Sequence, residues 1–415
     1  MKRKALLLAY VWPEPMSSAA GVRDQELIAL FTELGWDVTV ASHSKPNAAL
    51  ATLQAQGIRT QEVELNRSSF DDWLGQEKFA VVVFDRFVTE EQFNARVARN
   101  LPAALRILDT QDLHSLRRAR EAIIKKGGSI EESVEAGQGL SGPDFLRELA
   151  SIFRSDLTLV LSDFELELLK NHYSLPPELL AYFPFAQNIP ETWPHFSEPE
   201  FDFSFLGNFR HPPNLDSILW TVREIWPLIR KEMPQAKLRV MGSYPPREVM
   251  ALANESSGII VDGPIEDPVI ELGKCAVNLA ALRFGAGIKG KICDAWTAGL
   301  PTVTTDIGAE GMRLGEAFGG IIENRAHAFA LASVGLRNDP LARTNLAELG
   351  RRTLQEKFAR ECQRNLLMGL LEDLGSIEKR RQRNPIGAML SAEERRASDY
   401  FSRWIELKEK KISEL

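Results

Sequence analysis

The sequence predicts an α/β protein with two doubly wound, Rossmann-like parallel-sheet domains. Two observations lead to this prediction. A chain of 415 residues is too long for one ordinary hydrophobic core and suits two domains. Apolar runs of strand length alternate with helical segments, stop at a proline- and aromatic-rich stretch at residues 176–200, and then resume. Such alternation is typical of parallel sheets with helices on both faces.

In the first half, residues 5–11 form an apolar run that we predict to be a buried strand. The run superficially resembles a signal peptide, but it is short and ends at prolines without a cleavage site. The amphipathic segment 22–34 predicts a helix that Gly35 ends. A break rich in Gly, Ser and Glu at residues 125–142 predicts a mobile loop. Further strands are expected at residues 37–42, 80–84, 105–108 and 157–161.

The second half repeats the pattern, with strands expected at residues 203–206, 237–241 and 259–262. From residue 326 onward the chain reads as mainly helical. We therefore divide it into an N-terminal domain, a linker, a second domain and C-terminal helices. The predicted bounds are residues 1–185, 186–200, 201–358 and 359–415.

The most informative stretch is the strand–turn–helix–strand unit at residues 276–305. An apolar run is followed by a glycine-rich turn, a helical segment that Gly299 can end, and a second apolar run. Glycines allow the backbone to approach a ligand closely, and a helix N-terminus offers free N–H groups to an anion. Lys289 and Lys291 add positive charge at the same place. The unit therefore predicts a phosphate-binding site.

Two general patterns fit the turn. Gly285, Gly287 and Gly290 have the spacing of the dinucleotide fingerprint, and Asp306 follows the next strand, where a ribose ligand would stand. That fingerprint usually lies on the first strand of a domain, whereas several elements precede this one. The turn also approaches the nucleoside-triphosphatase loop, but Ile292 occupies the position of the magnesium-binding hydroxyl.

A wider pattern carries a family resemblance. Phe284-Gly285, Asp294-Ala295, Ala298-Gly299-x-Pro301 and Val303 resemble the donor site of the family-four retaining glycosyltransferases, in the group-1 superfamily with the GT-B fold. The family usually carries two glutamates separated by seven residues. Here Asp294 stands at the second position, where the resemblance implies that it binds the donor ribose, and Ala286 stands at the first. The resemblance also implies donor contacts by Gly285, Ala286, Gly287, Ile288 and Lys289.

The segment from Phe205 to Asn214 is similar to a second family motif, in which Gly-Arg is followed by a Lys and both cations contact the diphosphate. Gly207 is present, but Asn208 stands in place of the Arg and Asn214 near the place of the Lys. Arg210 is a candidate substitute. Lys289 is the better candidate for a phosphate contact, and Lys291 either assists it or points into solvent.

The resemblance extends more loosely to the first domain. It implies that the two domains face each other across a cleft and that the C-terminal helices at residues 359–415 cross back to the first domain. His114 follows a predicted strand end and resembles the family's histidine beside the transferred sugar, with Asp109 or Asp112 to orient it or to bind an acceptor hydroxyl. Gly21 and Arg23 open the first long helix, where the family's glycine loop faces the diphosphate. For each of these residues a structural role is the alternative. The final candidate is Glu310, which would partly replace the acid missing at position 286.

No cofactor or metal is expected. The sequence has no Asp-x-Asp motif, its six histidines have no zinc-like spacing, and its three cysteines read as reduced and structural. A formal net charge of −7 argues against general nucleic-acid binding. No segment has the length needed to span a bilayer, so we expect a cytoplasmic protein, with peripheral membrane contact left open. An aromatic stripe at residues 400–407 favours an intramolecular docking face over a membrane anchor.

The resemblance therefore implies a retaining, metal-independent, hexosyltransferase-like enzyme that uses a nucleoside-diphosphate sugar. The acceptor stays open among glycans, lipid-linked sugars, proteins and metabolites. Three alternatives remain: a non-catalytic sugar-nucleotide-binding protein, a nicotinamide-dependent oxidoreductase that uses the glycine fingerprint, and a sugar-nucleotide epimerase.

Overall fold

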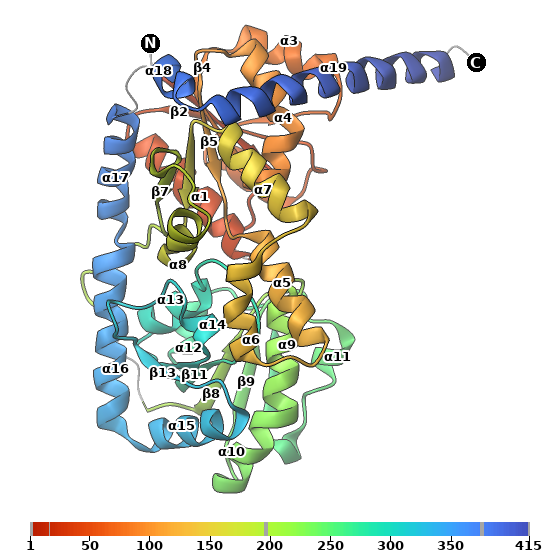
Figure 1. Ribbon diagram of the computed structural model, residues 1–415. Helices are drawn as coiled ribbons and strands as arrows, with labels where there is room; N and C mark the ends of the chain where they lie inside the picture. The colour runs from red at the N-terminus through yellow and green to blue at the C-terminus, as the bar shows by residue number, and fades with distance from the viewer. Residues whose placement is uncertain (1–2, 16, 195–197, 374–376, 414–415) are drawn as a thin grey trace.

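The structure, a computed structural model, describes residues 3–15, 17–194, 198–373 and 377–413. It confirms the predicted α/β architecture: a seven-stranded and a six-stranded parallel sheet, each covered by helices on both faces (Figure 1). The first sheet has the strand order β3-β2-β1-β4-β5-β6-β7. Its strands are β1 (Lys4–Ala9), β2 (Asp37–Ser42), β3 (Arg59–Glu62), β4 (Phe79–Asp85), β5 (Leu105–Asp109), β6 (Leu157–Val160) and β7 (Leu180–Tyr182).

Side chains along the central strand β1 alternate between two cores. Leu6 and Leu8 enter one buried cluster and Leu7 enters the other, as the period of two in a strand requires. The helices on the Leu7 face are α1 (Ala19–Glu33) and α2 (Ala48–Ala55). Those on the opposite face are α3 (Ser68–Gln76), α4 (Arg86–Asn100), α5 (His114–Lys125), α7 (Pro143–Arg154) and α8 (Asp163–Glu167).

The second sheet has the order β10-β9-β8-β11-β12-β13. Its strands are β8 (Phe201–Leu206), β9 (Leu238–Met241), β10 (Ile259–Gly263), β11 (Cys275–Ala280), β12 (Thr302–Thr304) and β13 (Gly320–Ile322). One face packs against α9 (Pro212–Trp220), α10 (Trp226–Glu232) and α15 (Ala326–Asn338). The remaining helices of this half are α11 (Arg247–Met250), α12 (Pro268–Leu272), α13 (Gly290–Thr297), α14 (Asp306–Ala309) and α16 (Pro340–Thr353).

One local prediction is wrong. The expected mobile loop at 125–142 contains helix α6 (Ile130–Glu135), because Ser129 and Glu132 form a reciprocal capping box that starts a helix. The proline- and aromatic-rich stretch at 176–200 includes β7, which pairs with β6 at the edge of the first sheet. Position 195, one of the six histidines, lies outside the described residues. Within the described ranges, no group of three or more His, Cys, Asp or Glu side chains is arranged to hold a metal ion.

The chain crosses back to the first half after the second sheet. Helix α17 (Arg360–Asp373) places Leu367, which is fully buried, in the cluster on the α1 face. Helix α18 (Ile377–Gln382) follows, and its Arg381 contacts Asp156 with Nε–Oδ1 and Nη2–Oδ2 distances of 2.7 and 2.8 Å. Arg381 also donates to the carbonyls of Pro102 and Ala104. The last part of the described chain thus helps to close the first core.

We expect Arg381→Met to lower the free energy of unfolding by about 2 kcal/mol, since it leaves the buried Asp156 carboxylate with fewer partners. Arg106 remains beside Asp156 and limits the loss. Urea unfolding of the whole chain measures the change. Arg352→Met is the matched control, because Arg352 forms an exposed ion pair with Glu356; an equal effect in both variants would contradict the prediction.

The expected intramolecular docking of the aromatic stripe is also wrong. Helix α19 (Pro385–Ser413) extends beyond the body of the protein (Figure 1). Tyr400, Phe401, Trp404 and Leu407 are 76, 54, 56 and 65 % exposed, because none of the described segments covers this part of the helix. None of the described helices is long and apolar enough to cross a membrane.

Candidate functional site

Each sheet has one point where the strand order reverses. In the second sheet, β8 has β9 on one side and β11 on the other; in the first sheet, β1 lies between β2 and β4 in the same way. In open α/β sheets, ligands bind outside the carboxyl ends of the strands at such a point. Gly207 follows β8 and the 281–289 turn follows β11, so these two predicted donor motifs lie at the expected place; in the first sheet, Asp85 ends β4 and Arg86 begins α4.

The glycine turn after β11 rests against the end of β5 in the first half. Gly287 has a φ of 65°, and a Cβ there would lie 3.0 Å from the Cβ of Asp112, so a side chain would be strained and crowded. The Gly287 N–H donates to Oε1 of Glu165 at 2.8 Å, and Arg120 donates to the carbonyl of Gly285 at 2.8 Å. The two halves are therefore in direct contact at the turn.

Two lysines lie at the start of helix α13. Lys289 is buried and donates to the Gly287 carbonyl at 2.7 Å, and burial lowers its pKa to about 8. Lys291 donates to Oδ1 of Asn214 at 2.5 Å and lies 5.2 Å from the centre of the Phe205 ring. Burial and the charge of Lys289 lower its pKa to about 7. Lys291 therefore does not point into solvent. Its ammonium group contacts the side chain of Asn214, which stands near the place of the Lys in the family motif.

Asp294 follows one turn along the same helix. Burial, with a smaller contribution from the charge of Asp267, raises the pKa of its carboxyl group to about 7. Among the described residues, none donates a hydrogen bond to this half-buried carboxylate. Asp267 is the N-cap of α12, beyond the end of β10. Asp294 thus offers acceptor oxygens on the side of the site away from the first half.

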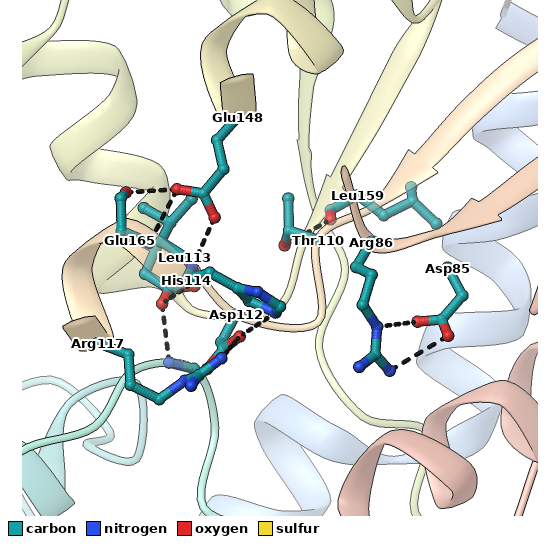
Figure 2. Close-up of polar contacts among 12 residues, drawn as sticks. Asp85, Arg86, Thr110, Asp112, Leu113, His114, Arg117, Glu148, Leu159 and Glu165 are labelled. Carbon is teal, nitrogen blue, oxygen red and sulfur yellow. Dashed lines mark hydrogen bonds and ion pairs between the residues drawn. The ribbon is translucent and has the colours of Figure 1, made fainter. Parts of the chain in front are cut away.

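Asp112 and His114 form the opposite wall (Figure 2). Oδ1 of Asp112 lies 3.1 Å from Nε2 of His114, and its Oδ2 lies 2.7 Å from Nε of Arg117. Burial raises the pKa of Asp112, but the charges of Arg117 and His114 outweigh it and hold the pKa well below its usual range. The backbone N–H of His114 donates to Oε1 of Glu148 at 2.6 Å. The imidazole is therefore held by an ionised carboxylate.

Asp109 and Arg23 lie elsewhere. Both side chains are completely buried, and Nη2 of Arg23 lies 2.9 Å from Oδ1 of Asp109. Arg23 also donates to the carbonyls of Phe183 and Pro184. As placed, neither residue reaches the cleft, and Arg23 is not an exposed first-turn residue either. Gly21 lies beside Glu14, where a Cβ would come within 2.4 Å of the backbone, so it allows the preceding loop to pack on α1.

The remaining donor candidates are dispersed. Asn208 donates to the Ser17 carbonyl at 2.6 Å and so joins the two halves near Gly207. Arg210 stacks on Tyr244, with its guanidinium carbon 3.6 Å from the ring centre. Ala286 packs against a core cluster of the first half, and Ile288 is buried in a different core cluster.

Glu310 forms a two-pronged ion pair with Arg120, at 2.6 and 2.7 Å. The Arg120 side chain is completely buried and that of Glu310 is 9 % exposed. Arg120 also donates to the Ser133 carbonyl at 3.0 Å. In this structure the Glu310 carboxylate is thus occupied by a cation from the first half.

Sequence reasoning missed Glu165, Glu148 and Arg120, which hold the site together. Burial raises the pKa of Glu165 to about 7, and its Oε1 accepts from both Leu113 and Gly287 (Figure 2). Glu165 lies in α8, directly after β6, so the position of a carboxylate just past a strand end was the available signal. Arg120 and Glu148 are interior helix positions and carried no such signal.

A second missed group lies at the switch point of the first sheet. Arg86 contacts both oxygens of Asp85, at 3.0 and 3.2 Å, and lies 5.2 Å from the centre of the Tyr10 ring (Figure 2). Arg86 and Gln111, at the ends of neighbouring strands, both have a φ of 62°. Non-glycine residues rarely adopt this conformation, and such strain concentrates at functional sites.

The geometry does not favour a dinucleotide fingerprint. The six-stranded sheet begins with β8, not β11, and Gly285 lies five residues beyond the end of β11. Asp306, the expected ribose ligand, contacts Arg313 and Asn324 at 3.2 and 2.8 Å.

Comparisons with known proteins give a family match for part of the chain and structural neighbours for nearly all of it. Residues 200–339 match the model of the family "Glycosyl transferases group 1". A Klebsiella pneumoniae protein described as an uncharacterized 44.6 kDa protein in the cps region is 27 % identical over 137 residues, 30 % of this chain and 35 % of that protein. The match therefore spans about a third of that relative.

Solved structures share the fold over nearly the whole chain. A Rickettsia africae glycosyltransferase has a TM-score of 0.64 at 11 % identity, covering 90 % of this chain and 98 % of its own. Staphylococcus aureus TarM, in complex with fondaparinux, α-GlcNAc-glycerol and UDP, has a TM-score of 0.66 at 9 % identity over 89 and 99 %. Anabaena HepE with UDP-glucose has a TM-score of 0.64 at 11 % identity over 89 and 99 %. The chain thus shares the GT-B fold of these structures, and residues 200–339 in its second half match the group 1 glycosyl transferase model.

Proposed function

We propose that this protein transfers a sugar from a nucleoside-diphosphate donor to an acceptor, with retention of configuration and without a metal ion. The observation that carries the proposal is the order of groups along α13. Lys289 and Lys291 present two ammonium groups at the N-terminus of the helix, and Asp294 presents an unpartnered carboxylate one turn later. This order suits a diphosphate followed by a ribose.

The same order sets the direction of the donor. With the ribose hydroxyls on Asp294 and the diphosphate on the two lysines, the sugar would lie toward Gly287, where the turn meets Asp112. His114 would then contact the sugar, and Asp112 would hold its imidazole in place. The base would extend toward Asp267 and the end of β10, because Asp294 lies within range of the Asp267 charge.

The positive charge that the family motif places at positions 208 and 214 would come from Lys291 instead. Its ammonium group is hydrogen-bonded to the Asn214 side chain, so a lysine from α13 would supply positive charge where Asn214 replaces the Lys of the family motif. Charge of this kind stabilises the leaving diphosphate, which supports transfer without a metal. No side chain in the site is an evident covalent nucleophile, so the donor phosphate itself would take the proton of the acceptor hydroxyl in a front-face substitution.

The acceptor would enter from the switch point of the first sheet, where Tyr10, Asp85 and Arg86 lie. Asp85 is buried and holds Arg86 in place, Arg86 is partly exposed and can donate hydrogen bonds to hydroxyl groups, and Tyr10, which is 37 % exposed, offers an aromatic face. These groups support an acceptor with hydroxyl groups.

A thermal-shift screen of the whole chain tests the proposal. UDP, GDP, ADP, dTDP, CMP, NAD and NADP are each added with EDTA and with magnesium. We expect one nucleoside diphosphate to stabilise the protein equally in both, by about 2.7 kcal/mol at a hundred times its dissociation constant. Asp294→Asn should weaken its affinity by roughly 30- to 100-fold through loss of the ribose contact. Asp202→Asn, at the opposite end of the same sheet, is the control.

The outcomes separate the alternatives. A response to NAD or NADP alone would support the oxidoreductase. Magnesium-dependent binding would contradict a metal-independent donor site. The protein is then incubated with the matching nucleotide sugar and candidate acceptors, and the products are analysed. Nucleotide binding without turnover of the nucleotide sugar would support the non-catalytic protein. A changed donor sugar without transfer would support the epimerase.

A further inference from the structure

The end of the described chain forms a long helix of which only the first part is packed. Asn384 donates to the Phe153 carbonyl at 2.7 Å and accepts from the Gly387 N–H at 2.8 Å, which fixes the start of α19 against α7. The helix continues to residue 413 and projects from the first half into solvent (Figure 1). An isolated helix has little stability in water, so the projecting part needs a surface to pack on.

The projecting part carries an apolar stripe. At 100° per residue, Tyr400, Trp404 and Leu407 fall within a 60° arc, and Phe401 lies about 60° beyond Trp404. All four are more than half exposed. The Phe401 and Trp404 rings are stacked, with centroids 6.2 Å apart. Ile386 and Met389, 46 and 62 % exposed, fall on the same arc nearer the body. Glu393 lies on this arc between the two groups, so the apolar stripe of the projecting part is Tyr400–Leu407.

Charge distinguishes the C-terminal segment, α18 and α19 together, from the rest of the protein. Residues 376–415 contain ten Lys and Arg and seven Asp and Glu, a formal net charge of +3. This excess lies in residues 376–384, with four basic residues and one acidic residue, whereas residues 385–415 contain six of each sign. The chain as a whole has a net charge of −7, so the remaining residues carry −10. An anionic surface would attract α18 and repel the body, which brings the adjoining α19 toward that surface.

We propose that α19 docks on an anionic lipid surface, with the Tyr400–Leu407 stripe in the interface between headgroups and acyl chains. Tyr and Trp are favoured there because their rings are apolar and their tips are polar. Lys408 lies 5.0 Å from the centre of the Trp404 ring, so a cation borders the stripe where it can reach the headgroups.

A second copy of the helix fits the stripe less well. Two-stranded coiled coils prefer branched aliphatic residues at the seam, whereas this stripe is mainly aromatic and has Lys408 beside it. The inference does not rest on the proposed transferase activity, because it uses only the exposed helix and the charge of the C-terminal segment.

The test is co-sedimentation of the whole protein with vesicles. Vesicles of phosphatidylcholine alone are compared with vesicles of phosphatidylcholine and phosphatidylglycerol, at low and high salt. We expect binding to the mixed vesicles that weakens with salt, and a loss of about tenfold or more in Tyr400→Ser/Phe401→Ser/Trp404→Ser. Leu331→Ser/Leu341→Ser removes exposed apolar side chains from the second half and should bind as wild type does.

Each outcome decides the inference. Because the substituted aromatic side chains are exposed, the triple variant should keep its thermal transition, which separates lost docking from misfolding. Equal binding by the triple variant, or no binding by wild type, would overturn the proposal. A dimer seen by sedimentation velocity that the triple variant abolishes, with no vesicle binding, would also overturn it and assign the stripe to a second copy.

Discussion

Replacing Lys289 and Lys291 together by methionine should weaken nucleoside-diphosphate binding by roughly two to four orders of magnitude. Each lysine would contribute a charge-assisted hydrogen bond to the diphosphate, and such bonds are worth about 1.5–3 kcal/mol each. Methionine fills similar volume without the charge, and it relieves the cost of burying two ammonium groups, so the variant should fold at least as well. Calorimetric titration measures the affinity.

The pH dependence gives this prediction a second readout. Without ligand, the pKa values of Lys289 and Lys291 are about 8 and 7, so both lose protons as the pH rises from 7 to 9. An anion favours the protonated forms, so binding raises both pKa values and takes up protons. Affinity should therefore fall from pH 7 to pH 9 in wild type and change little in the double variant.

The control for the lysines is Lys237→Met, an exposed residue at the far end of the second sheet, which should bind as wild type does. An uncharged nucleoside should bind wild type and the double variant alike, because it makes no diphosphate contact. A double variant with undiminished diphosphate affinity would remove the two lysines from the site.

Arg120→Met should lower the free energy of unfolding by about 3–5 kcal/mol. The guanidinium is completely buried, pairs with both oxygens of Glu310, and donates to the carbonyls of Gly285 and Ser133. Its loss leaves the mostly buried Glu310 carboxylate without its cation, and an uncompensated buried charge is strongly destabilising. Urea unfolding of the ligand-free protein measures the effect.

Glu310→Gln tests whether the unpaired charge of Glu310 causes the loss of stability in Arg120→Met. Combined with Arg120→Met, it should cost clearly less than the sum of the two single changes, because the second substitution removes the charge that the first left unpaired. Arg118→Met, an exposed neighbour on α5 that pairs with Asp144, should cost less than about 1 kcal/mol. A loss below 1 kcal/mol for Arg120→Met would show that the pair contributes little.

The sequence was sufficient for the architecture because the interior strands are uniformly apolar. β1, β4 and β11 are buried along nearly their whole length and stand out as apolar runs. The edge strands β3 and β7 did not stand out, since β3 is polar, Arg59-Thr-Gln-Glu62, and β7 has only three residues. Helix α6 was hidden in a segment whose Gly and Ser content resembles a loop.

The site could be predicted where its residues are close in sequence. The turn with Lys289, and Asp112 with His114, follow strand ends, and the structure brings them together. The pairing of Arg23 with Asp109 joins residues 86 positions apart, and that of Lys291 with Asn214 joins residues 77 apart. Hydrophobic periodicity indicates on which face of a helix or strand a residue lies, but it does not identify the distant residue that pairs with a charged side chain. The roles of these residues could therefore be seen only in the structure.

The return of the chain to its first half has a consequence for the order of folding. The core on the α1 face includes Leu367, and the edge near Asp156 is held by Arg381. A ribosome releases the sheet strands of the first half, which end at residue 182, long before it makes these two residues. The first core therefore stays incomplete while the whole second half is synthesised, and the Arg381–Asp156 contact that helps to finish it joins residues 225 positions apart. Domains that wait in this way expose apolar surface to chaperones or aggregation, so the N-terminal half should mature last although it is made first.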